Sequence, residues 1–124
     1  MNLVDSSGWL EYFARGVNAS FFAPAIKARD SLIVPTICLY EVFKRLLKLR
    51  DEEDALAAVG VMSLGILVDL TREIAVDGAW ISYELQIAMA DSIILSTARA
   101  YKATLWTQDA DFKSIEGIRY IEKR

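Results

Sequence analysis

Short segments typical of buried β-strands alternate along the chain with longer segments typical of amphipathic helices. The predicted strands are residues 2–4, 31–35, 66–70, 104–106 and 118–121. The apolar spacing and the cap residues predict helices at residues 7–15, 18–29, 37–49, 72–87 and 91–101, and one more that starts at the acidic residues 51–54 and ends by Gly65. Because alternation of this kind is typical of parallel strands, we expect an α/β fold with helices on both faces of the sheet.

Local signals refine several of these boundaries. We expect Thr36 and Thr71 to cap the helices that follow them, and we expect the helix at residues 18–29 to be interrupted near Pro24. The segment from Glu84 to Met89 carries no turn signal, so it is predicted to be largely helical.

Length and composition indicate a single domain over residues 1–124. Hydrophobic residues make up 54% of the chain, which is enough to build a filled core. No apolar run reaches the roughly 18 residues that a membrane span needs, and no basic-then-apolar secretion signal begins the chain. Cys38 lies alone in an apolar stretch and is predicted to be a small core residue. We expect a soluble, cytoplasmic protein that does not bind membranes.

The absence of histidine excludes several kinds of chemistry. Ser-His-Asp and Cys-His catalysis are impossible, as are zinc sites that depend on histidine and RNA cleavage by paired histidines. The net charge of −3 is unlike that of a general nucleic-acid binder, although a cation at an acidic site would offset part of it. Carboxylate chemistry, with or without a metal, remains for a hydrolase.

Acidic residues follow two of the predicted strands. Asp5 ends the first strand, and Asp109 and Asp111 follow the fourth. Glu41 lies in the helix after the second strand, and Asp91 opens the helix before the fourth. In an open parallel sheet these positions can meet at the carboxyl edge, where ligands bind. Crowded carboxylates stay ionised when a cation joins them, and oxygen ligands favour Mg²⁺ or Mn²⁺.

Each of these residues also has a simpler interpretation. Asp5 can be an ordinary helix N-cap, and Asp91 can be an acid that stabilises the positive end of a helix. Glu41, Lys44, Arg45 and Lys48 share one helix face. That face is either a solvated surface with a Glu41–Arg45 pair, or a metal ligand beside a track for phosphates.

The order and setting of the acids resemble the PIN-domain family, most closely its small toxin ribonucleases of VapBC-type toxin–antitoxin modules. The resemblance covers residues 2–121. The segments that carry it are Val4-Asp5-Ser6-Ser7, Glu41 in a helix after Val34-Pro35-Thr36, Ala90-Asp91-Ser92-Ile93-Ile94, and Leu105-Trp106-Thr107-Gln108-Asp109-Ala110-Asp111-Phe112.

The resemblance implies a three-layer α/β/α sandwich with a central, mainly parallel sheet of four to five strands. It implies a Mg²⁺- or Mn²⁺-dependent endoribonuclease that forms a homodimer and is inhibited by a cognate antitoxin protein. By position, the catalytic and metal-binding acids would be Asp5, Glu41, Asp91 and Asp109, with Asp111 as an accessory ligand and Ser6 and Thr107 as supporting hydroxyls. If the chain is a nuclease, we expect Lys44, Arg45, Lys48 and Arg15 to hold the phosphate backbone of RNA.

Three other functions are compatible with an α/β fold of this kind. A phosphoacceptor signalling domain would be phosphorylated at Asp69, but it needs two adjacent acids where Asp5 is followed by serines. A phosphatase with an Asp-x-Asp pair would need an acid where Ser7 stands. A non-catalytic binding module would keep the fold and use the groove for a partner, although it has no need for crowded like charges.

Overall fold

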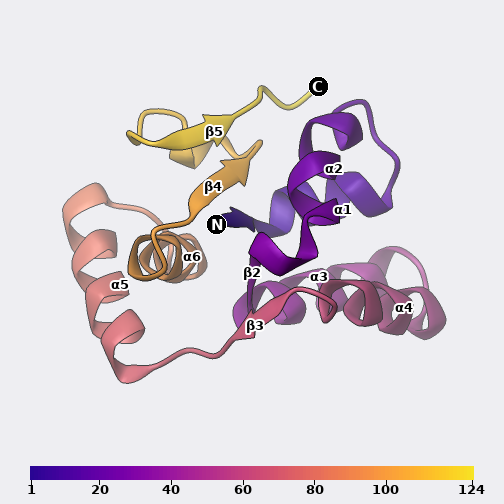
Figure 1. Ribbon diagram of the computed structural model, residues 1–124, viewed down its shortest axis with the longest axis horizontal. Helices are drawn as coiled ribbons and strands as arrows, with labels where there is room; N and C mark the ends of the chain where they lie inside the picture. The colour runs from indigo at the N-terminus through magenta and orange to yellow at the C-terminus, as the bar shows by residue number, and fades with distance from the viewer.

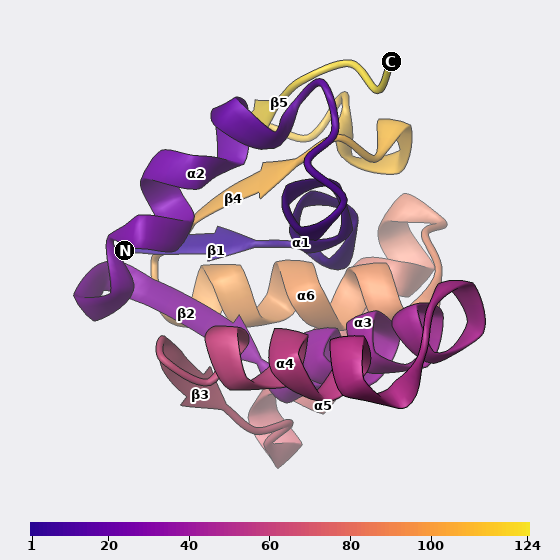
Figure 2. The same cartoon turned by 90° about the vertical axis from the view of Figure 1, so that its right-hand side faces the viewer.

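One parallel sheet forms the centre of the computed structural model, which describes residues 1–124. Its strands run in the order β3-β2-β1-β4-β5, and every neighbouring pair is parallel. Figure 2 shows β1, β2 and β4 pointing the same way. The predicted parallel sheet is therefore confirmed, with strands β1 (Asn2–Val4), β2 (Leu32–Pro35), β3 (Ile66–Val68), β4 (Thr104–Thr107) and β5 (Ile118–Tyr120).

Helices cover both faces of this sheet. In Figure 1, α5 and α6 lie on one side of the strands, and α1 to α4 lie on the other. The three-layer α/β/α arrangement is confirmed. The helices are α1 (Ser6–Phe13), α2 (Ala19–Lys27), α3 (Thr36–Leu49), α4 (Glu52–Met62), α5 (Arg72–Leu85) and α6 (Met89–Ala100), with short 3₁₀ turns η1 (Arg29–Ser31) and η2 (Ala110–Phe112). None of these helices is both long enough and apolar enough to cross a membrane.

The direction of the chain across the sheet reverses between β1 and β4. From β1 the chain builds outward to β2 and then β3, and it returns through α5 and α6 to place β4 on the other side of β1. Right-handed crossovers in opposite directions lie on opposite faces, so the connections diverge at this point. A crevice between such connections, outside the carboxyl ends of the strands, is where open α/β sheets bind ligands.

The central strands consist of continuous apolar residues because both of their faces lie in the core. Leu3, Val4, Ile33 and Val34 are wholly buried because helices pack on both faces of the sheet. Cys38 is also wholly buried, as predicted, and burial raises the pKa of its thiol far above the ordinary value. The largest side chains with almost no exposure are Trp9, Phe22 and Phe112.

Two local predictions are wrong. Thr36 does not cap α3; it is the first helical residue, and Pro35 occupies the cap position without a side-chain hydrogen bond. Pro24 does not interrupt α2, which runs unbroken from Ala19 to Lys27. Phe22, Ala25 and Ile26 of this helix are buried, so tertiary packing holds the turns on both sides of the proline.

The predicted helix at residues 72–87 is correctly capped by Thr71 but ends earlier than expected. Thr71 Oγ1 accepts a hydrogen bond from the Ile74 amide at 3.2 Å. The helix stops at Leu85, and Gln86 takes a left-handed conformation with φ of 57°. Ser82 Oγ donates to the Ile87 carbonyl at 2.7 Å, so a side chain satisfies the backbone at this break. The break lets α6 begin at Met89, two residues before Asp91.

Candidate active site

Asp5 is a buried carboxylate at the end of β1. Its amide donates to the Trp106 carbonyl at 3.1 Å, which continues the pairing of β1 with β4. Its Oδ1 accepts hydrogen bonds from Ser7 Oγ at 2.7 Å and from the Gly8 amide at 2.9 Å. Thr107 Oγ1 donates to its other oxygen at 2.5 Å. Asp5 is thus the N-cap of α1, as its simpler interpretation required, and it is also fixed in place by the end of β4.

The environment of Asp5 disfavours its charge despite these three donors. The pKa of Asp5 is raised to about 6, chiefly by burial and to a smaller extent by the charge of Asp109, against the opposing effect of the hydrogen bonds from Thr107, Ser7 and Gly8. A carboxylate this buried is most stable either with a proton or beside a cation.

Three more carboxylates gather beside the end of β4. Oxygen atoms of Asp91, Asp109 and Asp111 all lie within 4.8 Å of one another. Asp109 caps the η2 turn by accepting from the Asp111 amide at 2.9 Å, and its own amide donates to Thr107 Oγ1 at 2.9 Å. Asp91 reaches the same place from the first turn of α6. Thr107 therefore touches both Asp5 and Asp109.

Asp91 is the acid most affected by its neighbours. It is half-buried, and this desolvation is the largest reason that its pKa rises to about 7. The charges of Asp109, Asp111, Asp5 and Glu41, in that order, account for the rest of this rise in pKa. The acids from four distant parts of the chain are therefore close enough to repel one another at a single edge of the sheet.

Glu41 joins this edge from α3. Its Oε1 accepts a hydrogen bond from Ser6 Oγ at 2.7 Å, which links α3 to the first residue of α1. The Glu41–Arg45 pair expected on a solvated face does not form, since the one ion pair of the structure joins Arg50 and Asp54. Asp69 lies apart, because it follows the edge strand β3, and β2 and β1 separate that strand from β4.

The chemistry of the donor set fits a hard divalent cation. The site contains carboxylate and hydroxyl oxygens and no accessible sulfur or imidazole, which matches the preference of Mg²⁺ and Mn²⁺. Burial and, to a smaller extent, the charges of neighbouring acids raise the pKa values of Asp5 and Asp91, and a bound cation would favour the ionised form of both groups. Asp91, Asp109 and Asp111 are the residues whose oxygens lie near enough to share one ion.

The basic residues suggested by the sequence lie in different places. Lys44, Arg45 and Lys48 are exposed on α3, and Lys44 Nζ lies 5.7 Å from the centre of the Tyr40 ring. Arg15 is exposed with φ of 54° after the end of α1. Of these four, Arg45 alone lines a hollow that also contacts Ser7 and Gln108.

Sequence reasoning missed the polar network beneath that hollow. Asn18, only 3% exposed, donates from Nδ2 to Gln108 Oε1 and to the Glu122 carbonyl, each at 3.0 Å. Gln108 Nε2 lies 3.5 Å from the Ser7 carbonyl that accepts from it. Asn18 and Gln108 are 90 positions apart, so no local pattern connects them. The one available signal was Asn18, an amide residue between Val17 and Ala19.

Comparisons with known proteins agree on the type of domain. A family model described as the PIN domain matches residues 3–118. A search of curated proteins finds no match to the sequence.

Several solved structures share the fold at low sequence identity. A toxin–antitoxin complex from Klebsiella pneumoniae has a TM-score of 0.77 at 23% identity, covering 95% of this chain and 95% of that one. The Sarcin-Ricin loop cleaving toxin VapC20 of Mycobacterium tuberculosis has a TM-score of 0.79 at 13% identity, with coverage of 96% and 98%. VapBC2 from Rickettsia felis, bound to a DNA fragment from its promoter, has a TM-score of 0.75 at 18% identity, with coverage of 98% and 97%.

Proposed function

The chain belongs to the PIN domain family, and from this premise we propose that it is a metal-dependent endoribonuclease. We further propose that it is the toxin of a VapBC-type toxin–antitoxin module. The observation that carries the proposal is the single edge at which Asp5, Glu41, Asp91, Asp109 and Asp111 act on one another's charge.

The residues of the candidate site would have two roles, binding of the cation and positioning of the acids. Asp91, Asp109 and Asp111 would hold Mg²⁺ or Mn²⁺, with Asp5 and Glu41 beside them. When bound, such a cation supplies Lewis-acid stabilisation of phosphoryl charge and lowers the pKa of water. Thr107 keeps Asp5 and Asp109 in register through two hydrogen bonds, of 2.5 and 2.9 Å. Ser6 positions Glu41 in the same way from α1.

The test is cleavage of RNA in Mg²⁺ or Mn²⁺ by the parent and by single variants. Asp5→Asn and Asp91→Asn are expected to lose activity by a factor on the order of 100 or more, because each removes charge where the substrate's phosphoryl group would be stabilised. Asp69→Asn is the matched control, since Asp69 is an exposed acid after an edge strand. Cleavage by the Asp5 and Asp91 variants at the parent's rate would exclude the assignment.

If the chain is instead a non-catalytic binding module, the opposite results for metal binding and RNA cleavage are expected. A pure binding surface would take up neither Mg²⁺ nor Mn²⁺ with measurable heat and would cut no RNA. Calorimetric titration of the full chain with Mn²⁺ separates the two functions, and Asp91→Asn should abolish the heat if the acids bind the ion.

An antitoxin protein is the proposed partner. Structures with this fold from Klebsiella pneumoniae and Rickettsia felis are toxin–antitoxin complexes, which supports a partner of that kind here. RNA and the antitoxin would both be met in the cytoplasm.

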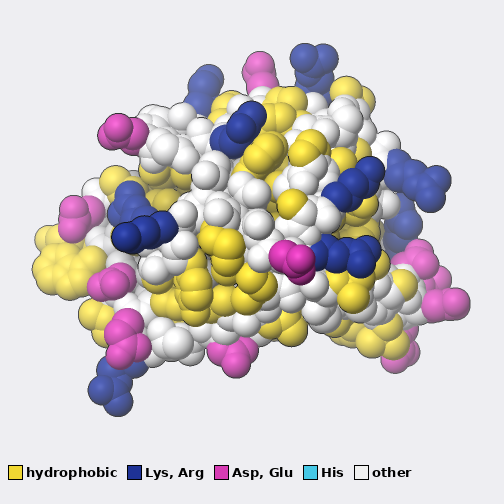
Figure 3. All heavy atoms as spheres, in the orientation of Figure 1, with side chains coloured by type: hydrophobic (Ala, Val, Ile, Leu, Met, Phe, Trp, Pro, Cys, Tyr) yellow, Lys and Arg dark blue, Asp and Glu magenta, His cyan; other side chains and the backbone are white.

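A homodimer is also proposed, and one helix face supports it. Val76, Trp80 and Tyr83 of α5 are 53%, 60% and 73% exposed and, with Ala75 and Ala79, line a wholly hydrophobic depression. Figure 3 shows hydrophobic side chains on the side where α5 lies in Figure 1. Aromatic side chains gathered in this way are typical of protein interfaces. A second copy of the chain would cover them.

Sedimentation velocity tests this interface. The parent is expected to sediment as a dimer and Trp80→Glu as a monomer, because the new charge would have to be buried. Leu56→Glu on α4, where Leu56 is 54% exposed, is the control and should remain dimeric. A parent that is monomeric at every concentration would refute the dimer.

A further inference from the structure

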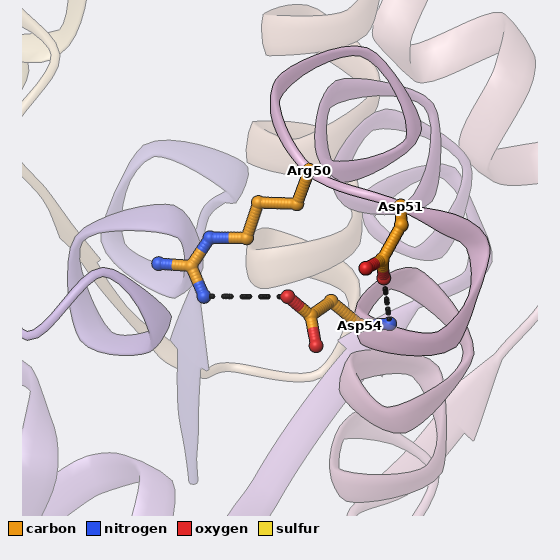
Figure 4. Close-up of polar contacts among 3 residues, drawn as sticks. All are labelled: Arg50, Asp51 and Asp54. Carbon is orange, nitrogen blue, oxygen red and sulfur yellow. Dashed lines mark hydrogen bonds and ion pairs between the residues drawn. The ribbon is translucent and has the colours of Figure 1, made fainter.

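Asn18 stands at the start of α2 but does not use its side chain as a residue in that position usually does. An asparagine at a helix N-cap ordinarily accepts a hydrogen bond from an amide of the first turn. Asp51 does so at the start of α4, where its Oδ1 accepts from the Asp54 amide at 2.8 Å (Figure 4). Asp5 and Thr71 cap α1 and α5 in the same way. Asn18 is the N-cap of α2 and makes no such bond, so its side chain is available for another contact.

The side-chain amide of Asn18 instead joins two segments at the carboxyl ends of β4 and β5. Its Nδ2 donates to Gln108 Oε1, one residue beyond β4, and to the Glu122 carbonyl, two residues beyond β5, each at 3.0 Å. The Ile121 amide donates to the Thr107 carbonyl at 3.1 Å, which extends the pairing of these strands to the same place. One amide group therefore ties the end of β4 to the end of β5.

Gln108 carries this connection to two of the acids. It immediately precedes Asp109 in the chain. Its backbone amide donates to Ser7 Oγ at 3.4 Å, and its Nε2 donates to the Ser7 carbonyl at 3.5 Å. Ser7 Oγ in turn donates to Asp5 Oδ1 at 2.7 Å. A displacement of Gln108 would therefore move Asp109 and disturb a hydrogen-bond donor of Asp5 at the same time.

The loop that carries Asn18 is itself held against α1. Glu11 Oε2 accepts a hydrogen bond from the Asn18 amide at 2.8 Å. The loop lies so close to this carboxylate that a Cβ at Gly16 would collide with it. Asn18 is 3% exposed and Gln108 is 4% exposed, which leaves both side chains almost no surface for a metal ion or a substrate. Any effect of Asn18 on the candidate site must therefore act through the residues that it holds.

We propose that Asn18 is a positioning residue of the candidate metal site. Through Gln108 it fixes the position of Asp109, and through Gln108 and Ser7 it fixes that of Asp5. This role rests on the proposed metal-dependent ribonuclease function and adds a residue on which that function depends. Replacement of residues that orient metal ligands without touching the ion typically changes metal affinity or activity by about 10- to 100-fold.

The experiment compares Asn18→Leu, Gln108→Met and the double variant with the parent. Leucine and methionine nearly keep the size of the replaced side chains but lack the amide group. Asn2→Leu is the matched control, because Asn2 begins β1, at the end of the strand away from Asp5, and its Oδ1 accepts from Trp106 Nε1 at 2.9 Å. Calorimetry gives the Mn²⁺ affinity of each protein, RNA cleavage gives kcat and KM separately, and urea unfolding gives the stability.

Asn18→Leu and Gln108→Met are each expected to weaken Mn²⁺ binding and to lower kcat by about 10- to 100-fold. The KM for RNA should stay near the parent's value, since neither side chain reaches the substrate. The double variant should be no worse than the stronger single variant, because both changes remove the same connection. Asn2→Leu should lower stability, since it leaves the Trp106 indole without its partner, but it should keep the parent's Mn²⁺ affinity and kcat.

Several outcomes would overturn the proposal. One is the parent's Mn²⁺ affinity in both folded single variants, and another is an equal loss of affinity in Asn2→Leu, since the effect would then follow from stability alone. Effects of Asn18→Leu and Gln108→Met that add in full would reject the connection through Gln108. If Asn18→Leu does not fold, Asn18→Ser takes its place, because serine is an ordinary N-cap residue that is too short to reach Gln108.

Failure of the proposed function has its own signature. If the parent binds Mn²⁺ but cuts no RNA, the ribonuclease function fails, while the Mn²⁺ affinities still decide the role of Asn18. A parent that binds no Mn²⁺ would overturn both proposals.

Discussion

Thr107 donates a hydrogen bond of 2.5 Å to Asp5 across a sequence separation of 102 residues. Thr107→Val keeps the shape of the side chain but leaves a buried carboxylate without one donor. We expect the free energy of unfolding to fall by about 1–3 kcal/mol and the pKa of Asp5 to rise further. Urea unfolding near pH 8 measures the first effect. Thr104→Val, at the start of the same strand, is the control and should change little.

The pKa values of Asp5 and Asp91 give a second prediction at the scale of single residues. They are raised from 3.8 to about 6 and about 7, so between the ordinary and raised values the folded protein binds more protons than the unfolded chain. Without divalent ions, stability should therefore rise as the pH falls from about 8 toward about 5. For buried Asp5 the gain is on the order of 1 kcal/mol.

Urea unfolding in a chelating buffer across this pH range is the measurement. Asp5→Asn replaces the titrating carboxyl with a neutral amide, so it should be more stable than the parent near pH 8 and should show a shallower pH dependence. Asp69→Asn should leave the dependence unchanged. A parent whose stability rises toward alkaline pH over this range would contradict the raised pKa values.

The contact between α1 and α2 leaves no room for a side chain at Gly8. A Cβ there would lie 2.6 Å from Val4 Cγ1 and 2.7 Å from Phe22 Cε1. Gly60, in the middle of α4, has no neighbouring atom within 4 Å of the same position. Gly8→Ala should destabilise the protein by about 1–3 kcal/mol, although alanine favours helix, because neighbouring core atoms must move.

Gly60→Ala is the matched helical substitution and should stabilise the protein by up to about 1 kcal/mol through helix propensity alone. Thermal unfolding of both variants tests the pair. Because the Gly8 amide also binds Asp5, Gly8→Ala should lose more RNA cleavage than its stability change explains. Equal effects of the two substitutions on stability would contradict the packing described here.

The two ends of α5 differ in how well the local sequence predicts them. The N-cap of α5 at Thr71 was predictable, because a threonine that precedes an amphipathic helix commonly accepts a hydrogen bond from a backbone amide in the first turn. The end of α5 was not, since Gln86 has no special preference for the left-handed conformation that it adopts. Hydrogen bonds from the Ser82 hydroxyl and from the Gln86 side chain stabilise that turn once the two helices pack.

The whole molecule should be stabilised by divalent cations. A ligand that binds only the folded state adds about 2.7 kcal/mol of stability at 100 times its dissociation constant. Mg²⁺ or Mn²⁺ is therefore expected to raise the melting temperature near pH 8, and binding near pH 6 to 7 should release protons because Asp5 and Asp91 have raised pKa values.

Differential scanning calorimetry of the parent, Asp91→Asn and Asp109→Asn makes the comparison. Both variants lose an oxygen ligand of the candidate site, so the rise caused by Mn²⁺ should shrink or vanish in them. Asp69→Asn should respond like the parent. An undiminished rise in Asp91→Asn would place the ion somewhere else.

The sequence by itself determined the class of fold and the chemistry that remained possible. Strand-like and helix-like apolar patterns alternate along the chain, which favours a parallel sheet between two layers of helices. That arrangement buries both faces of the sheet and the apolar face of each helix. The absence of histidine left carboxylate chemistry, with or without a metal, as the means of hydrolysis. The positions of Asp5 and Asp109 after two strands indicated a shared edge, since parallel strands end on the same side.

Only the tertiary structure decided which side chains meet there and what supports them. The contacts of Thr107 with Asp5, Ser6 with Glu41 and Asn18 with Gln108 join residues 35 to 102 positions apart. Local preferences extend over a few residues and carry no information about such pairs. Burial also sets the charge of the site, because the desolvation that raises the pKa of Asp5 exists only after both helical layers close over the sheet.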